Sequence, residues 1–204
     1  MAASFHIGVF LTAAALAALF FGFGSLLKVS DLLQEHGFRW FRGSSIVVGA
    51  VATALCLAGI VLGGPALQIF WLAVVLHWVL RGRIDGVNHG LMAIAVLLLV
   101  SRAVPLGEAL APFVYFFALL SVLGLIHDYL QYTAVDPPRA IAWFFANQHL
   151  YWYLIALGYA VVFRWDLPFL AGVYGFVKGY GFFYNTSRYA MLARVGIAQP
   201  ASPV

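Results

Sequence analysis

The densest run of ionisable side chains in this sequence lies between His77 and His89 and reads His-Trp-Val-Leu-Arg-Gly-Arg-Ile-Asp-Gly-Val-Asn-His. Asp85 and His89 are four residues apart, so a helix that begins near Asp85 would place both side chains on one face. A carboxylate and an imidazole on one face can share a divalent cation or act as an acid and a base. Alternatively, Asp85 only caps the following helix, with Asn88 and His89 as boundary residues.

A second pair with the same chemistry, His127 and Asp128, lies near the end of another apolar segment. Either side chain could act as an acid or base, and Asp128 could join Asp85 and His89 as a third ligand of a divalent cation. The alternative is a helix end whose polar groups reach toward water. The expected catalytic residues are Asp85, His89, His127 and Asp128, and the only cofactor these residues suggest is a divalent cation.

Basic side chains near these pairs suggest a site for an anionic group. Arg81 and Arg83 flank a glycine, and an arginine fork can bind a phosphate or a lipid headgroup, although both could serve only as a topology signal. Lys178, in a glycine-rich apolar segment, could bind an anionic headgroup, pair with Asp128 or extend its ammonium group to the membrane surface. The predicted ligand-binding residues are His77, Arg81, Arg83, Asn88 and Lys178.

Other metal centres have less support in the sequence. His77 and His127 could ligate a haem, because histidines on facing helices do so in membrane cytochromes, but each stands alone on its segment. The single cysteine, Cys56, allows neither an intrachain disulfide nor a thiol metal cluster.

The composition identifies an integral membrane protein. The 204 residues are 64% hydrophobic and 9% charged, with a mean hydropathy of +0.97. Soluble domains are roughly 45–50% apolar and about 25% charged, so that class is excluded. The net charge of +4 is spread over short loops and forms no Lys/Arg tract, so we do not expect a nucleic-acid partner.

Continuous apolar runs predict an all-α, polytopic bundle of seven transmembrane helices in one domain, residues 1–194. A span needs about 20 apolar residues to cross roughly 30 Å of hydrocarbon, and the runs lack the alternation of a barrel strand. Residues 28–43 mix charges with aromatic residues and predict an interfacial segment, and residues 195–204 predict a disordered tail. The predicted spans are 5–27, 44–63, 66–82, 88–106, 109–132, 148–164 and 167–187.

The distribution of Lys and Arg predicts the topology. With seven spans, one side of the membrane receives nine basic residues, whereas the other receives only Arg102 and Arg164. The positive-inside rule then places the N-terminus outside and the C-terminus in the cytoplasm. The nine are Lys28, Arg39, Arg42, Arg81, Arg83, Arg139, Lys178, Arg188 and Arg194.

One portion of the chain resembles a known family. Residues 21–93, with Gly-Ser-Leu-Leu-Lys after the first span, Gly37-Phe38, a glycine-dotted second span and a polar end to the third, resemble the DoxX-like small membrane proteins. The resemblance covers under half of the chain, and no functional residue is carried over from it.

These observations predict a polar pocket that faces the cytoplasm. Our first functional hypothesis is an enzyme in the bacterial cytoplasmic membrane that acts on a lipid or isoprenoid with an anionic headgroup. The alternative is a non-catalytic transporter or an accessory subunit of a larger membrane complex. The expected partners are membrane lipids, with homo-oligomers or other membrane proteins as further candidates.

Overall fold

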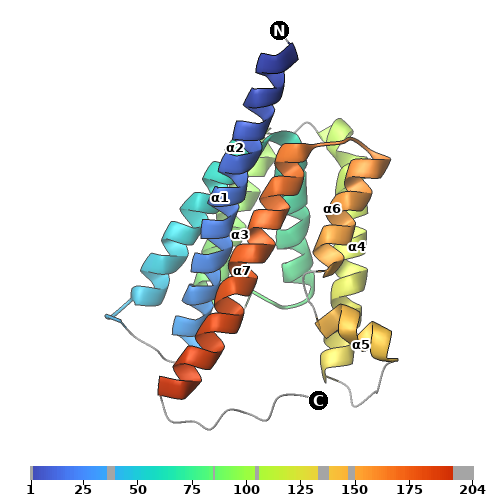
Figure 1. The fold of residues 1–204 in the computed structure, drawn as a ribbon. Coiled ribbons are helices and arrows are strands. Elements are labelled where there is room, and N and C mark those ends of the chain that lie inside the picture. The colour runs from blue at the N-terminus through green and yellow to red at the C-terminus, as the bar shows by residue number, and fades with distance from the viewer. Residues whose placement is uncertain are drawn as a thin grey trace.

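The computed structural model of this chain describes residues 2–35, 40–84, 86–103, 106–132, 138–146 and 150–194, and these are helical without any strand. The predicted all-helical class is therefore confirmed for the described residues (Figure 1). The helices are α1 (Ala2–Glu35), α2 (Ser44–Leu80), α3 (Val87–Ala103), α4 (Leu106–Tyr132), α5 (Arg139–Ala146), α6 (Leu150–Val162) and α7 (Leu167–Arg194).

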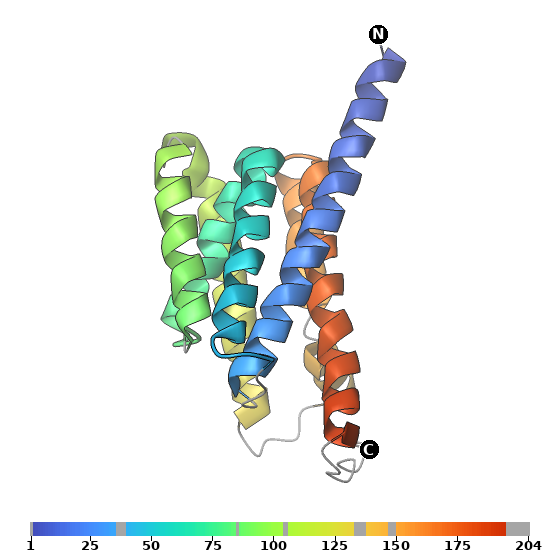
Figure 2. The same cartoon turned by 90° about the vertical axis from the view of Figure 1, so that its left-hand side faces the viewer.

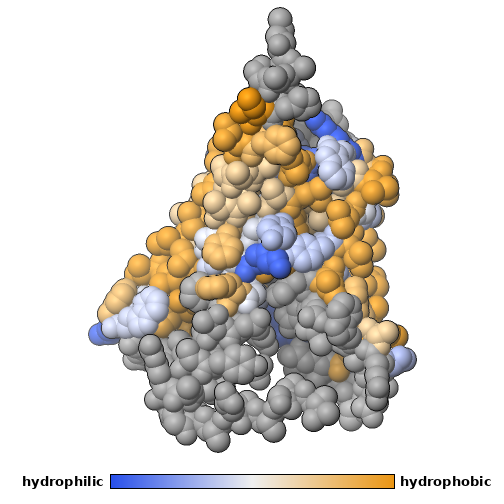
Figure 3. Space-filling model, viewed as in Figure 1, coloured by the Kyte–Doolittle hydropathy of each residue, from blue (hydrophilic) through white to orange (hydrophobic). Residues whose placement is uncertain are grey.

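The membrane class also follows from the structure. Among the described residues, three helical stretches are long and apolar enough to cross a membrane, namely Ile7–Gln34, Ser44–Leu80 and Ala109–Leu130. The apolar helices of α3 and α6 are shorter. Hydrophobic residues also cover much of the face formed by α1, α6 and α7 (Figure 3). A surface of this kind is suited to lipid and not to water.

Helix α2 consists of two antiparallel arms joined at Gly64. This glycine has φ 72° and ψ −167°, a backbone conformation that is essentially restricted to glycine, and Pro65 follows where a helix needs no amide donor. Ser45, in the first arm, accepts a hydrogen bond from Ser30 of α1, and Trp78, in the second arm, packs on His89 of α3. Both arms therefore meet at one end of the bundle, called the polar end below (Figure 2). The predicted boundary between residues 63 and 66 coincides with the turn.

Helix α1 extends beyond the predicted end of the first span. The sequence places that end at Leu27 and an interfacial segment at 28–43, whereas α1 continues to Glu35 with Leu32 and Leu33 buried. The helix stays inside the bundle because its polar side chains find partners on other helices, as described below. Residues 36–39 of the predicted segment lie outside the described part of the chain, and Trp40 is exposed, as an interfacial position requires.

Helices α1 and α7 form the most extensive helix pair of the fold and lie side by side in both views (Figures 1 and 2). Glycines on α7 allow this approach: a Cβ atom at Gly175 would lie 2.9 Å from the Cα of Ala17, and one at Gly179 would lie 2.9 Å from the Cα of Phe21. Small residues at these positions let two backbones meet, as in many membrane helix pairs.

The second arm of α2 is held in place by an aromatic core. Trp71 stacks on Phe20 of α1 with ring centroids 5.7 Å apart, and its edge meets Phe176 of α7 at 4.9 Å. Phe70, the preceding residue, packs on Phe116 of α4 at 5.2 Å. These contacts fix the rotation of the arm, so that His77 and Arg81, further along the same arm, face α4.

We predict that Gly175→Ala destabilises the protein by about 1–3 kcal/mol, because the added methyl group meets the backbone of α1, which cannot move without separating the helices. Reversible unfolding in mixed micelles measures the effect. Gly8→Ala in α1 is the matched control, because a Cβ there meets nothing within 4 Å. Equal stability of the two variants would contradict the close packing of α1 on α7.

Candidate functional site

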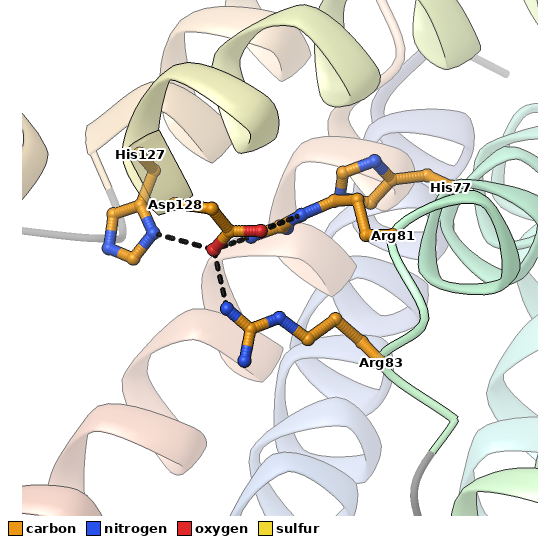
Figure 4. A network of polar contacts seen from close by, with 5 residues as sticks. All are labelled: His77, Arg81, Arg83, His127 and Asp128. Carbon is orange, nitrogen blue, oxygen red and sulfur yellow. Dashed lines mark hydrogen bonds and ion pairs between the residues drawn. The ribbon is translucent and has the colours of Figure 1, made fainter. Parts of the chain in front are cut away.

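Five of the predicted residues come together at the polar end, where the second arm of α2 meets the end of α4 (Figure 4). We call them the Arg–Asp cluster. His77 belongs to the last turn of α2, Arg81 is the C-cap of that helix, and Arg83 lies in the loop that follows. His127 and Asp128 belong to α4.

The carboxylate of Asp128 lies between two guanidinium groups. Arg81 donates from Nε to Oδ2 at 2.7 Å and from Nη2 to Oδ1, which is the bidentate geometry that makes arginine–carboxylate pairs strong. Arg83 donates from Nη2 to the same Oδ1 at 2.6 Å. The side chain of Arg81 is 8% exposed and that of Asp128 18%, whereas that of Arg83 is 37% exposed. Arg83 is thus the member of the trio that faces outward.

The local sequence Arg-Gly-Arg is a helix stop that turns Arg83 back toward Arg81. Gly82 has φ 63°, its amide donates to the carbonyl of Val79 at 3.1 Å, and the amide of Arg83 donates to the carbonyl of Trp78 at 2.9 Å. This is a Schellman motif, in which glycine takes the left-handed position after the helix. The motif lets one turn of chain present two arginines to a single carboxylate.

His77 is buried beside Arg81, with its Nε2 2.9 Å from Nη1 of Arg81. A guanidinium only donates, so Nε2 must accept and the proton of the neutral ring is assigned to Nδ1. Among the described residues, Nδ1 of His77 is buried without a hydrogen-bond partner. The packing leaves little space on α4, since a Cβ at Gly124 would lie 2.8 Å from Nη1 of Arg81.

His127 borders the cluster from α4. Its Nδ1 lies 3.4 Å from Oδ1 of Asp128, and its side chain is mostly buried. A carboxylate beside Nδ1 favours the proton on that nitrogen, so Nε2 is the nitrogen that can accept a proton from a substrate. Sequence reasoning missed another neighbour, Tyr151, which is buried at the start of α6 and interacts with Arg81 and Asp128.

Asn88 and His89 belong to a second network, formed with residues of α1 and α7. His89 Nε2 lies 3.3 Å from Oδ1 of Asp31, and the hydroxyl of Tyr180 donates to Oδ2 of Asp31 at 3.4 Å. Lys28 Nζ is 3.8 Å from the same Oδ2. The Asp31 network therefore joins α1, α3 and α7 at the polar end.

Asn88 extends this network toward the start of α2. Its Nδ2 donates to the hydroxyl of Ser30 and to the carbonyl of Ser45, the latter at 3.2 Å. Sequence reasoning missed Ser30 and Asp31. The signal was present, because Lys28 and Asp31 have the i, i+3 spacing of an intrahelical ion pair, which allows a span to continue past two charges.

Lys178 lies in neither group. It is exposed on α7, with Nζ 5.7 Å from the centroid of the Tyr174 ring. The predicted pairing of Lys178 with Asp128 does not form, because both oxygens of that carboxylate bind arginine.

The metal prediction involves residues that take different partners. His89 binds Asp31 and Asp128 binds arginine, whereas Asp85 lies outside the described residues. In the described part of the chain, no group of three or more His, Cys, Asp or Glu side chains is arranged to hold a metal ion. A haem bound through Nε2 of His77 would have to displace Nη1 of Arg81 from that nitrogen.

Comparison of the chain with protein-family models, with curated proteins and with solved structures finds no match. The resemblance of residues 21–93 to DoxX-like proteins therefore carries no argument, and function must be inferred from the residues themselves.

We predict that Asp128→Asn destabilises the protein by about 3 kcal/mol, because it leaves Arg81 buried without an anion. The double variant Arg81→Leu/Asp128→Leu should recover most of that loss, because it removes both charges. Arg83→Gln should cost less than about 1 kcal/mol, since Arg83 is partly exposed. Unfolding in mixed micelles ranks the three, and a double variant no more stable than Asp128→Asn would refute a buried ion pair.

Proposed function

We propose that the chain crosses the membrane seven times, with each arm of α2 as one span, the N-terminus outside and the C-terminus in the cytoplasm. The positions of the described basic residues support this topology. Arg42, Arg81 and Arg83 lie at the polar end, whereas Arg102 and Arg164 follow the opposite ends of α3 and α6. The polar end is then the cytoplasmic one by the positive-inside rule.

We predict that cysteines introduced at positions 42 and 164 react from opposite sides of the membrane. The background is Cys56→Ala, which removes the single native thiol. The test uses sealed vesicles in which the non-cytoplasmic face of the membrane meets the solution. A membrane-impermeant maleimide should then label position 164 at once and position 42 only after permeabilisation. Labelling of both from one side, or the reverse order, would contradict the proposed topology.

We further propose that the Arg–Asp cluster binds the anionic headgroup of a lipid or isoprenoid at the cytoplasmic surface and that the protein is an enzyme acting on it. The observation that carries this proposal is the ratio of charges: Arg81 and Arg83 share the one carboxylate of Asp128. The side chain of Arg83 is 37% exposed, so it is the arginine that another molecule can reach. A phosphate or carboxylate at this side of the cluster would accept hydrogen bonds from Arg83.

His127 is the best candidate for proton transfer. Asp128 is held ionised between two arginines and is therefore an orienting group and not a general base. Its neighbour His127 keeps Nε2 for the proton of a headgroup hydroxyl or of water. His89, another predicted catalytic residue, stays a proposal for a separate role beside Asp31. Asp85, the fourth, lies outside the described residues and stays a proposal as well.

A non-catalytic function is the second candidate, and one observation favours it. Each oxygen of Asp128 already accepts from arginine, so the cluster also fits a brace between α2 and α4 in an accessory subunit. A transporter is less well supported, because the described polar networks gather at one end of the helices instead of along a path.

We predict that Arg83→Gln weakens binding of phosphatidylglycerol about tenfold, the loss expected for a charge-assisted hydrogen bond. Native mass spectrometry of the protein in nanodiscs measures retained lipid, with phosphatidylcholine as the neutral reference. Arg42→Gln is the matched control, because Arg42 is an exposed arginine at the same end.

His127→Gln distinguishes the two candidate functions. It should leave headgroup binding unchanged and alter the lipid profile of cells in the same way as deletion of the gene. If Arg83→Gln and Arg42→Gln bind lipid equally, the headgroup site is wrong. If His127→Gln cells keep the wild-type lipid profile, the non-catalytic function replaces the enzyme.

A further inference from the structure

Lys178 has an unusual position for a charged residue. It lies 11 residues after Leu167, the first residue of α7. At 1.5 Å per residue, the distance between the two residues along the helix axis is about 16 Å, roughly half the thickness of the hydrocarbon. It is exposed, whereas Gly175 and Gly179, on an adjacent face of α7, are buried against α1. The ammonium group is thus presented outward from the bundle, near the middle of the proposed span.

The side chain does not extend toward the polar end. Nζ of Lys178 lies over the ring of Tyr174, one turn nearer to the start of α7. On the same face the exposed residues are apolar or aromatic, with Tyr174 on one side and Phe182 on the other, and with Leu154 on α6. Figure 3 shows a hydrophilic patch in the middle of this face, with hydrophobic surface between it and the end of the bundle that carries the N-terminus. Extension of the lysine to water at the membrane surface therefore does not explain its position.

A second polar group beside Lys178 also lacks a partner. The ring of Tyr153, on α6, lies 6.1 Å from that of Tyr174, and among the described residues its buried hydroxyl has no hydrogen-bond partner. The exposed ammonium group of Lys178 is a hydrogen-bond donor and therefore suits an acceptor that carries a negative charge. Tyr153, Tyr174 and Lys178 are called the lysine patch below.

The acidic side chains that the structure describes do not supply that acceptor. Asp31 and Asp128 belong to the two networks at the polar end, and Asp166 caps the start of α7 by accepting from the amide of Phe169 at 3.0 Å. A second copy of the chain offers no better partner, since none of the seven acidic residues falls in the middle of a predicted span. They are Asp31, Glu35, Asp85, Glu108, Asp128, Asp136 and Asp166.

We propose that the lysine patch is the docking site for a transmembrane helix of a different protein, and that this helix carries an Asp or Glu at the depth of Lys178. An intramembrane charge is costly unless it is paired, and the partner's carboxylate would accept from Lys178. Tyr174 lies against both side chains and fixes their geometry. The inference rests on the proposed crossing of the membrane by α7.

Model peptides provide the first test. The labelled protein is mixed in lipid vesicles with a leucine–alanine transmembrane peptide that carries one central Asp, Leu or Lys, and energy transfer reports association. The wild-type protein should bind the Asp peptide about tenfold more tightly than the Leu peptide, as expected for an interhelical polar contact in lipid. Lys178→Gln should abolish the preference, and Lys178→Asp should transfer it to the Lys peptide. No preference in the wild type, or the same preference in Lys178→Gln, would overturn the proposal.

Photocrosslinking in native membranes provides the second test. A photoreactive residue at position 174 should give a discrete protein adduct whose trapped segment contains an intramembrane Asp or Glu, and Lys178→Gln should remove it. An adduct with lipid alone, or with a segment that lacks an acid, would overturn the proposal. The Arg42→Gln variant should crosslink as the wild type does.

Failure of the underlying topology can be recognised separately. A cysteine at position 174 should resist water-soluble maleimide if α7 crosses the membrane. Ready labelling there would refute the span itself, whereas protection together with a failed peptide test would refute only the partner helix.

Discussion

Hydrocarbon cannot solvate a polar group, so each polar side chain within a membrane bundle must find its partner in protein, and this constraint shapes the whole polar end. Asp128 binds Arg81 and Arg83, and Asp31 binds His89 and Tyr180. The two networks join helices that are distant in the sequence. The opposite end of the bundle has no equivalent among the described residues and relies on apolar packing and on the turn at Gly64.

The residues that connect the helices at the polar end are also those that we propose to bind an anion. A buried ion pair is most stable when the charges are equal, yet here two guanidinium groups meet one carboxylate. Arg81 binds Asp128 by a bidentate pair of hydrogen bonds, and the more exposed Arg83 donates to Oδ1 of the same carboxylate. In the proposed headgroup site the inner arginine therefore keeps α2 and α4 together, and the outer arginine meets the headgroup.

The sequence predicts much of this architecture because hydrophobic runs and breaker residues act locally. The apolar segments, the boundary at Gly64 and Pro65, and the gathering of His77, Arg81 and Asp128 at one end all follow from local patterns. The continuation of α1 past Leu27 does not, because a hydropathy average counts Lys28 and Asp31 as charges leaving the membrane, whereas together they form a neutral pair.

Tertiary pairing is the other part that local patterns cannot supply. Asp128 could have met Lys178 or Arg81, and the choice depends on which helices are neighbours in the bundle.

The two lysines of the chain show that neighbouring residues determine whether an ammonium group has an acidic partner. Lys28 is buried, lies 3.8 Å from Asp31 and sits 5.2 Å from the ring of Tyr180. Lys178 has the same kind of aromatic neighbour, but no acidic side chain of the described residues pairs with it. If α7 crosses the membrane as we propose, a lysine on its outer face is as costly in lipid as one inside the bundle. The proposed anion from another molecule would then do for Lys178 what Asp31 does for Lys28.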